Sequence, residues 1–205
     1  MAATVAPAQL RAPDLDPTAR PGVLTVGTFL VIAGGVMLFG ALLGGYAAAR
    51  DAAQDAGQAW PPEAVVLPNV PLAMAYFTLL LSSFTAQWAV SAIKADSRTQ
   101  MYVAIGLTLV LGGCFINAMT FCWRLLELSA GADSFATTVY AVTVTHVVVV
   151  VAAHVLFLVL GFRALGGQFS PRNREFVDCA AAVWHFGVAA GAVIWATIWF
   201  LEGGP

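Results

Sequence analysis

Five long apolar runs dominate this sequence, at residues 23–49, 68–93, 101–123, 137–162 and 177–201. Each exceeds the roughly 20 residues that an α-helix needs to cross about 30 Å of bilayer hydrocarbon. The segments between the runs are short and carry nearly all of the charge. The sequence therefore predicts an all-α, polytopic membrane protein with five transmembrane helices.

The composition supports this class and excludes others. Of the 205 residues, 60% are hydrophobic and 10% are charged, against about 25% charged in soluble domains. A net charge of −2 lacks the basic surface that nucleic-acid binding requires. Without CxxC or metal-type spacing, the three cysteines are interpreted as small buried hydrophobic residues. We expect a mobile cytoplasmic tail over residues 1–20, with no removable signal peptide, and one membrane domain over residues 21–205.

Lys and Arg residues predict the orientation of the chain. If the N-terminus is cytoplasmic, the inside segments hold Arg11, Arg20, Lys94, Arg98, Arg163, Arg172 and Arg174. The outside segments then hold only Arg50 and Arg124, and they are otherwise acidic. Because short positively charged segments stay in the cytoplasm, we expect the N-terminus inside and the C-terminus outside.

Two GxxxG motifs indicate where helix backbones could approach closely. Gly40 and Gly44 form one motif in the first run, and Gly187 and Gly191 form the other in the last run. Small residues favour helix association in lipid, although chance matches are common in glycine-rich chains. Trp60, which precedes two prolines, predicts a rigid outer loop that is either a contact surface or a plain structural turn.

Ionisable groups are nearly absent from the middle of the runs, and the exceptions are His146, His154 and His185. Histidine is the commonest metal ligand and often holds membrane hemes. However, His146 and His154 are eight residues apart, about 12 Å along a helix, which is too far to share one metal. We expect neutral histidines that hydrogen-bond between helices, and no catalytic, cofactor-binding or metal-ligating residue in this chain.

Several short motifs occur in a fixed order along the chain. They are Arg20-Pro21 with Val26-Gly27-Thr28, Trp60-Pro61-Pro62, Leu81-Ser82-Ser83-Phe84-Thr85, Thr145-His146-Val147, Phe169-Ser170-Pro171, and Trp184-His185-Phe186 with Trp195 and Trp199. Together they resemble subunit III of the heme-copper cytochrome c and quinol oxidases, in the short five-helix bacterial form. The Trp60 loop looks like that of actinobacterial members.

The resemblance implies a non-catalytic subunit that supports sustained turnover. Such a subunit packs on catalytic subunit I and other oxidase subunits, and it holds phospholipid in a cleft between its first two helices and the rest. Heme and copper would lie in the partner subunits, in a bacterial inner membrane. The candidate lipid or subunit contacts are Trp184, His185, His146, Trp60, Gly40, Gly44, Gly187 and Gly191.

Other functions remain open at this point. An accessory protein of a nitric oxide reductase in the same family is the first alternative. A diheme cytochrome that uses His146, His154 and His185 is another. A small transporter is disfavoured, because buried charge and internal repeats are missing from the sequence.

The chain departs from the family pattern at four positions. The family's buried acids align with Gly35, Cys122 and Val188, and the first histidine of its paired-histidine motif aligns with Thr143. All four positions are expected to face the interior of the bundle. The chain therefore resembles a divergent member, in which roles tied to those acids are in doubt.

Overall fold

The computed structural model describes residues 22–200, and all regular structure within that range is helical. Its helices are α1 (Val23–Asp55), α2 (Asn69–Lys94), α3 (Arg98–Leu126), α4 (Ser134–Leu165) and α5 (Glu175–Ile194). A π-helical segment, η1 (Trp195–Phe200), continues α5. Five regions of the described chain are long and apolar enough to cross a membrane, which confirms the five predicted spans. The tail predicted over residues 1–20 lies outside the described residues.

Local sequence sets the ends of α4, the most apolar of these helices. Asp133 is its N-cap, and the Asp133 carboxylate accepts a hydrogen bond of 2.7 Å from the backbone N–H of Ala136, which satisfies a free donor of the first turn. Gly166 and Gly167 follow the last turn, and Gly167 has a φ of +70°, which favours glycine. The chain can therefore turn sharply towards α5.

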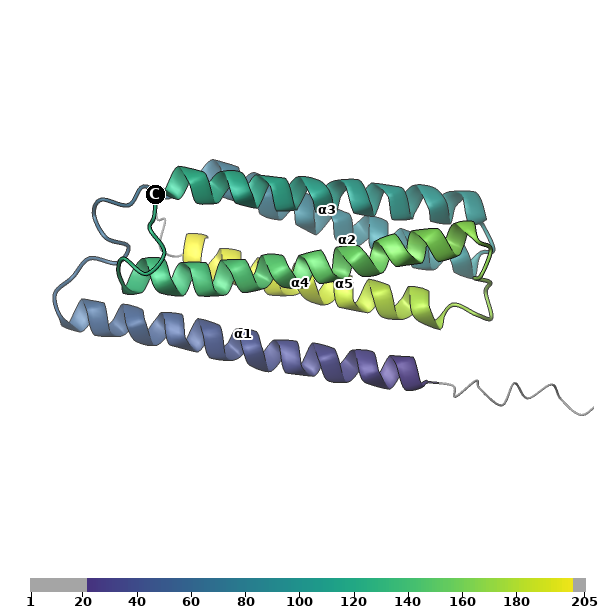
Figure 1. Cartoon of the computed structure of the whole chain (residues 1–205), viewed down its shortest axis with the longest axis horizontal. Coiled ribbons are helices and arrows are strands. Elements are labelled where there is room, and N and C mark those ends of the chain that lie inside the picture. The colour runs from purple at the N-terminus through teal and green to yellow at the C-terminus, as the bar shows by residue number, and fades with distance from the viewer. Residues whose placement is uncertain (1–21, 201–205) are drawn as a thin grey trace, which may run out of the picture.

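The helices pack in three layers, which are visible in Figure 1 as α2 with α3, α4 with α5, and α1 alone. Helices α2, α3, α4 and α5 form a four-helix bundle in which each helix contacts two others of the set. Helix α1 packs on α4 and α5 from the side opposite to α2 and α3. The first two helices therefore do not form a unit separated from the rest by a cleft, which corrects that expectation.

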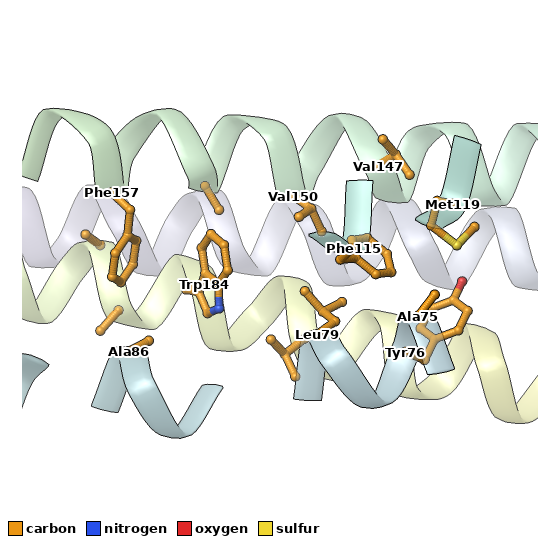
Figure 2. Packing of buried hydrophobic residues seen from close by; sticks show 14 of the residues in the cluster. Ala75, Tyr76, Leu79, Ala86, Phe115, Met119, Val147, Val150, Phe157 and Trp184 are labelled. Carbon is orange, nitrogen blue, oxygen red and sulfur yellow. The ribbon is translucent and has the colours of Figure 1, made fainter. Parts of the chain in front are cut away.

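The core lies within the four-helix bundle, where large side chains from all four helices interdigitate (Figure 2). Trp184 of α5 lies beside Phe157 of α4, with ring centroids 5.0 Å apart. Tyr76 of α2 lies beside Phe115 of α3 at 5.7 Å. Helix α1 adds two buried residues, Phe39 and Tyr46. The bundle is thus the rigid part of the molecule on which any functional surface is built.

Candidate functional site

A row of hydrogen bonds joins α2 to α5, and we call it the α2–α5 polar seam. It consists of Ser82, Ser83 and Gln87 of α2 with Trp184 and His185 of α5. The indole Nε1 of Trp184 donates to the Ser82 hydroxyl at 2.9 Å. The ring of His185 contacts the Ser83 hydroxyl through Nδ1 at 2.6 Å and the Gln87 side-chain oxygen through Nε2 at 3.2 Å. Two adjacent residues on one helix thereby meet two adjacent residues on the other.

The partners of His185 fix the direction of its hydrogen bonds. The amide oxygen of Gln87 can only accept, so Nε2 of His185 carries the proton and donates to it. In a neutral imidazole Nδ1 is then an acceptor, and the Ser83 hydroxyl donates to it. The sequence expectation that a histidine bonds to a neighbouring helix agrees with this geometry.

Trp184 fits into space that a glycine leaves open on α3. A Cβ atom built at Gly112 would lie 2.5 Å from Cη2 of Trp184 and 2.8 Å from Nδ1 of His154. Since such distances are far inside van der Waals contact, a side chain at this position would displace the indole. The indole is 1% exposed, so Trp184 holds α2, α3, α4 and α5 together from the centre of the bundle.

His146 occupies a second buried position, nearer the other end of the bundle. Its Nε2 donates to the carbonyl oxygen of Gly187 at 2.9 Å. Its ring lies against the aromatic rings of Phe39, Tyr76 and Phe115, at centroid distances of 5.6–6.1 Å. A Cβ atom at Gly191 would lie 2.9 Å from Cε1 of His146. The Gly187–Gly191 motif therefore gives α4 close access to α5.

Burial decides which of the candidate contact residues can reach lipid or another subunit. Trp184, His146, Gly187 and Gly191 are buried among the helices of this chain, so they are not available for such contacts. Their role is internal packing, which corrects the sequence interpretation. His185 is half-buried, and its ring forms the outer part of the polar seam.

Gly40 and Gly44 differ from the glycines of α5. Both are exposed, and no atom lies within 4 Å of a Cβ built at either position. The predicted close approach of helices is therefore absent from this motif within the described chain. Gly40 instead lines an apolar groove of about 280 Å³ between α1 and α5, with Val36, Phe39 and Phe186 among its other walls.

Trp60 connects the loop between α1 and α2 to two helices. Its indole Nε1 donates to the Tyr46 hydroxyl at 2.9 Å. Its ring also meets the rings of Tyr46 and Phe135, with centroid distances of 5.5 and 5.2 Å. The loop between α1 and α2 is therefore anchored, as the interpretation of a structural turn requires.

Polar contacts also fasten the opposite end of α1, and sequence reasoning did not single them out. One carboxylate oxygen of Glu175, in the first turn of α5, accepts from the backbone N–H of Thr25 at 3.0 Å and from the Thr25 hydroxyl at 2.8 Å. Thr25 lies in the first turn of α1, where free N–H groups and the helix dipole favour an anion. The sequence signal that could have indicated this contact was Glu175, an acidic residue at the start of the last span.

The four positions that depart from the family pattern face the interior, as expected. A Cβ atom at Gly35 would lie 2.5 Å from Cζ of Phe186, so that ring fills the space of a side chain. Cys122, Thr143 and Val188 are buried. The hydroxyl of Thr143 accepts a hydrogen bond of 3.1 Å from the indole Nε1 of Trp123. Neutral contacts therefore occupy these positions.

The three histidines are not gathered at one centre. His146 contacts Tyr76, His154 contacts Trp184, and His185 contacts Ser83. Within residues 22–200, no group of three or more His, Cys, Asp or Glu residues is placed to hold a metal ion. The diheme alternative gains no support from this arrangement.

A bundle of membrane-length helices, held by aromatic packing and neutral hydrogen bonds, defines a multi-pass membrane scaffold. The chain belongs to the cytochrome c oxidase subunit III family, which it matches over residues 16–201. As a member of this family it is a non-catalytic component of a heme-copper oxidase, so the nitric oxide reductase alternative is not favoured.

Named relatives come from bacteria and animals. The chain is 28% identical over 187 residues to "Probable cytochrome c oxidase subunit 3" of Nocardia farcinica, covering 89% of this chain and 90% of the relative. It is 25% identical over 187 residues, with the same coverage, to "Cytochrome c oxidase subunit 3" of Corynebacterium diphtheriae. It is 30% identical over 152 residues to the Strongylocentrotus purpuratus protein, covering 72% of this chain and 56% of that relative.

Proposed function

We propose that this chain is the subunit III of a bacterial cytochrome c oxidase, where it packs on the catalytic subunit and holds phospholipid. Family membership over residues 16–201 supports the assignment, as do the actinobacterial relatives that match along nearly their whole length. The heme and copper of the reaction would belong to the partner subunits. The contribution of this chain is to supply a rigid membrane surface.

The use of the Trp184-His185-Phe186 motif is the observation that carries this proposal. All three side chains contact other helices of the same chain. Trp184 and His185 bond Ser82 and Ser83 of α2, and Phe186 lies against Gly35 of α1. The motif that most resembles the oxidase family is therefore devoted to holding helices together. This use fits a structural subunit better than a redox protein.

The central experiment is purification of the complex through a tag on this chain, after extraction in a mild detergent. We expect subunit I and its heme and copper to co-purify, with oxygen reduction by the complex. Removing this chain should leave the heme spectrum intact and shorten the period of sustained turnover. Purification of the chain without any oxidase subunit would contradict the proposal.

His185 offers a test of the non-catalytic role. Substituting His185→Ala removes the hydrogen bonds to Ser83 and Gln87, which are worth about 0.6 kcal/mol each in membrane proteins and up to about 2. We expect less subunit retained in the complex, with turnover lowered in proportion. Complete loss of activity while the subunit is fully retained would mean that His185 serves the chemistry directly.

A bound lipid is best accommodated by the groove between α1 and α5. Its volume is about 280 Å³ and its walls are apolar, formed by side chains such as Val36, Leu43 and Val193 around the open position at Gly40. An acyl chain would fill this space. Native mass spectrometry of the complex should detect fewer bound lipids for Gly40→Leu than for Gly45→Leu, a control on the exposed surface of α1 outside the groove.

The orientation follows from the distribution of positive charge over the ends of the bundle. Lys94, Arg98, Arg163, Arg172 and Arg174 all lie at or beyond the helix ends that share one side, while Arg50 and Arg124 lie at the other. The positive-inside rule then puts the first side in the cytoplasm. A reporter fused after Pro205 should be active outside the cell, and one inserted near Ser97 should be active inside. The reverse pattern would refute this orientation.

A further inference from the structure

A polar side chain lies exposed on the membrane surface of the bundle, at the outer end of the polar seam. Gln87 is exposed, and it lies seven residues before Lys94, the last residue of α2. At 1.5 Å per residue, this places Gln87 about 10 Å from the end of the helix. A helix of 26 residues spans about 39 Å, so Gln87 lies within the hydrocarbon core of about 30 Å.

The side-chain amide of Gln87 has unused donors. Its oxygen accepts from Nε2 of His185, and within residues 22–200 its –NH₂ group makes no hydrogen bond. An amide N–H without a partner in hydrocarbon costs several kcal/mol. Because His185 is itself held by Ser83, its contact with the Gln87 oxygen restrains the exposed amide.

An apolar groove runs along α2 and α5 towards η1, and on α2 it ends two helical turns short of this amide. Its volume is about 230 Å³, and its walls include Phe77 and Leu80 of α2 and Val188 and Ala192 of α5, with Trp195 and Ala196 of η1. Gln87 follows Leu80 by seven residues on α2, so it lies on the same face two turns further along. His185 precedes Val188 by three residues on α5 and continues the other wall.

The shape and chemistry of this surface suit another helix better than a lipid tail. Ala192 and Ala196 are small, and small residues let a second helix approach closely. From Phe77 to Gln87 the surface is about 15 Å long, or nearly three helical turns. An acyl chain could fill the groove, but it has no acceptor for the Gln87 amide. A helix with a polar side chain can both fill the groove and accept a hydrogen bond from the Gln87 amide.

We propose that the groove between α2 and α5 receives a transmembrane helix of another oxidase subunit, which accepts a hydrogen bond from the Gln87 side-chain amide. The inference rests on the proposed function and adds the face of the molecule and the chemistry of the contact. The partner helix presents an acceptor, such as a Ser or Thr hydroxyl or a side-chain carbonyl, about two turns beyond the side chain that packs over Ala192.

Asn117 provides the natural comparison, because it is a second exposed amide within the membrane. It lies on α3 and has no side-chain hydrogen bond within the described residues. No neighbouring side chain holds it in place, in contrast to Gln87. The proposal places docking on the α2–α5 face because His185 holds Gln87 in place, and Asn117, which is equally unpaired, marks the competing α3 face.

The first test maps contacts in the intact, purified oxidase complex. A photo-crosslinking amino acid is placed at Ala192, in the groove, and in a separate variant at Val110, which is 62% exposed on α3. We expect the Ala192 probe to link to a transmembrane segment of another oxidase subunit and the Val110 probe not to do so. Links from Val110 alone, or links from Ala192 to lipid alone, would overturn the proposed docking face.

The second test compares Gln87→Leu with Asn117→Leu in the same complex. Loss of one interhelical hydrogen bond should raise the dissociation constant of the subunit by about 3-fold to 20-fold for Gln87→Leu, and leave it unchanged for Asn117→Leu. The opposite order would assign docking to α3, with the subunit function intact. If the wild-type chain bound no oxidase subunit at all, the proposed function itself would fail.

Discussion

Helix α1 is held against its neighbours in a different way from the four helices of the bundle, α2–α5. In the most apolar 18-residue window of α1, 6% of the window is buried. In the corresponding windows of the other four spans, the buried share is 33–44%. The bundle is joined by large side chains inserted beside glycines, such as Trp184 at Gly112. Helix α1 buries Phe39 and Tyr46 and is fastened at its two ends by Glu175 and Trp60.

The difference shows two ways to hold helices together in lipid. Between helices surrounded by hydrocarbon the hydrophobic effect contributes little, so association depends on packing and on hydrogen bonds. The bundle relies mainly on packing along its whole length. Helix α1 packs on α4 and α5 through fewer buried residues, such as Phe39, and through Gly35 with its neighbour Phe186, and has polar contacts towards its two ends. Much of its length remains exposed.

The largest effect should come from removing the side chain at the centre of the bundle. Substituting Trp184→Ala leaves a cavity between Phe157 and Gly112 and removes the donor to Ser82. We expect a loss of about 3–5 kcal/mol in unfolding free energy, measured by denaturation of the chain in detergent micelles. The control is Trp88→Ala, at a tryptophan that is 37% exposed, which should change stability little. Equal effects would contradict the central role of Trp184.

Glycine-to-alanine substitutions test the same contrast between the bundle and α1. Gly112→Ala places a Cβ atom 2.5 Å from the Trp184 ring, whereas Gly40→Ala meets no atom within 4 Å. Overpacking at Gly112 should cost about 1–3 kcal/mol, and Gly40→Ala should be neutral or slightly stabilising in the isolated chain, because alanine favours helices. The thermal midpoints of the two variants provide the measurement. A stable Gly112→Ala would mean that the bundle adjusts easily.

Glu175→Gln should loosen the N-terminal end of α1 without unfolding the bundle. The amide keeps one acceptor for Thr25 but loses the negative charge that the start of α1 favours. The expected local cost is about 0.5–2 kcal/mol, visible as faster hydrogen exchange in the first turns of α1. Asp178→Asn is the matched control, since Asp178 pairs with Arg174 on the surface at 3.1 Å. Faster exchange throughout the bundle would refute a local role.

The smallest effect is expected towards the C-terminal end of α1. Trp60→Phe keeps an aromatic ring beside Tyr46 and Phe135 but removes the N–H that bonds the Tyr46 hydroxyl. Loss of one such bond should cost about 0.5–1.5 kcal/mol. Hydrogen exchange around Tyr46 should increase, while exchange around Trp184 should not. Unchanged exchange at Tyr46 would show that ring packing alone anchors the loop.

Much of the fold was predictable because long apolar runs indicate membrane spans. The predicted run at 101–123 lies inside α3 (Arg98–Leu126), and the run at 137–162 lies inside α4 (Ser134–Leu165). The run at 177–201 was correct as a span, but nothing in its composition indicated that α5 changes to a π-helix at Trp195. Apolar length reports where a helix crosses the membrane and says little about its turn geometry.

The internal contacts were less predictable, since they depend on which faces meet. The GxxxG pattern is the same in α1 and α5, yet only the α5 glycines have neighbours within 4 Å of an added Cβ atom. The Ser82-Ser83 and Trp184-His185 pairs were recognised separately, and their pairing across helices required the structure. The exposure of Gln87 and its role beside His185 could not be read from a polar residue in an apolar run.

The contact between Glu175 and Thr25 also determines how deep α1 lies in the bilayer. Helix α1 has 33 residues, about 50 Å at 1.5 Å per residue, whereas the hydrocarbon core is about 30 Å thick. Its residues are uncharged from Val23 until Arg50, so hydrophobicity alone would let the helix slide along its axis. Glu175 holds the start of α1 level with the start of α5. The surplus length must then emerge at the opposite surface, where the exposed Asp51 and Asp55 lie in the last turns of α1.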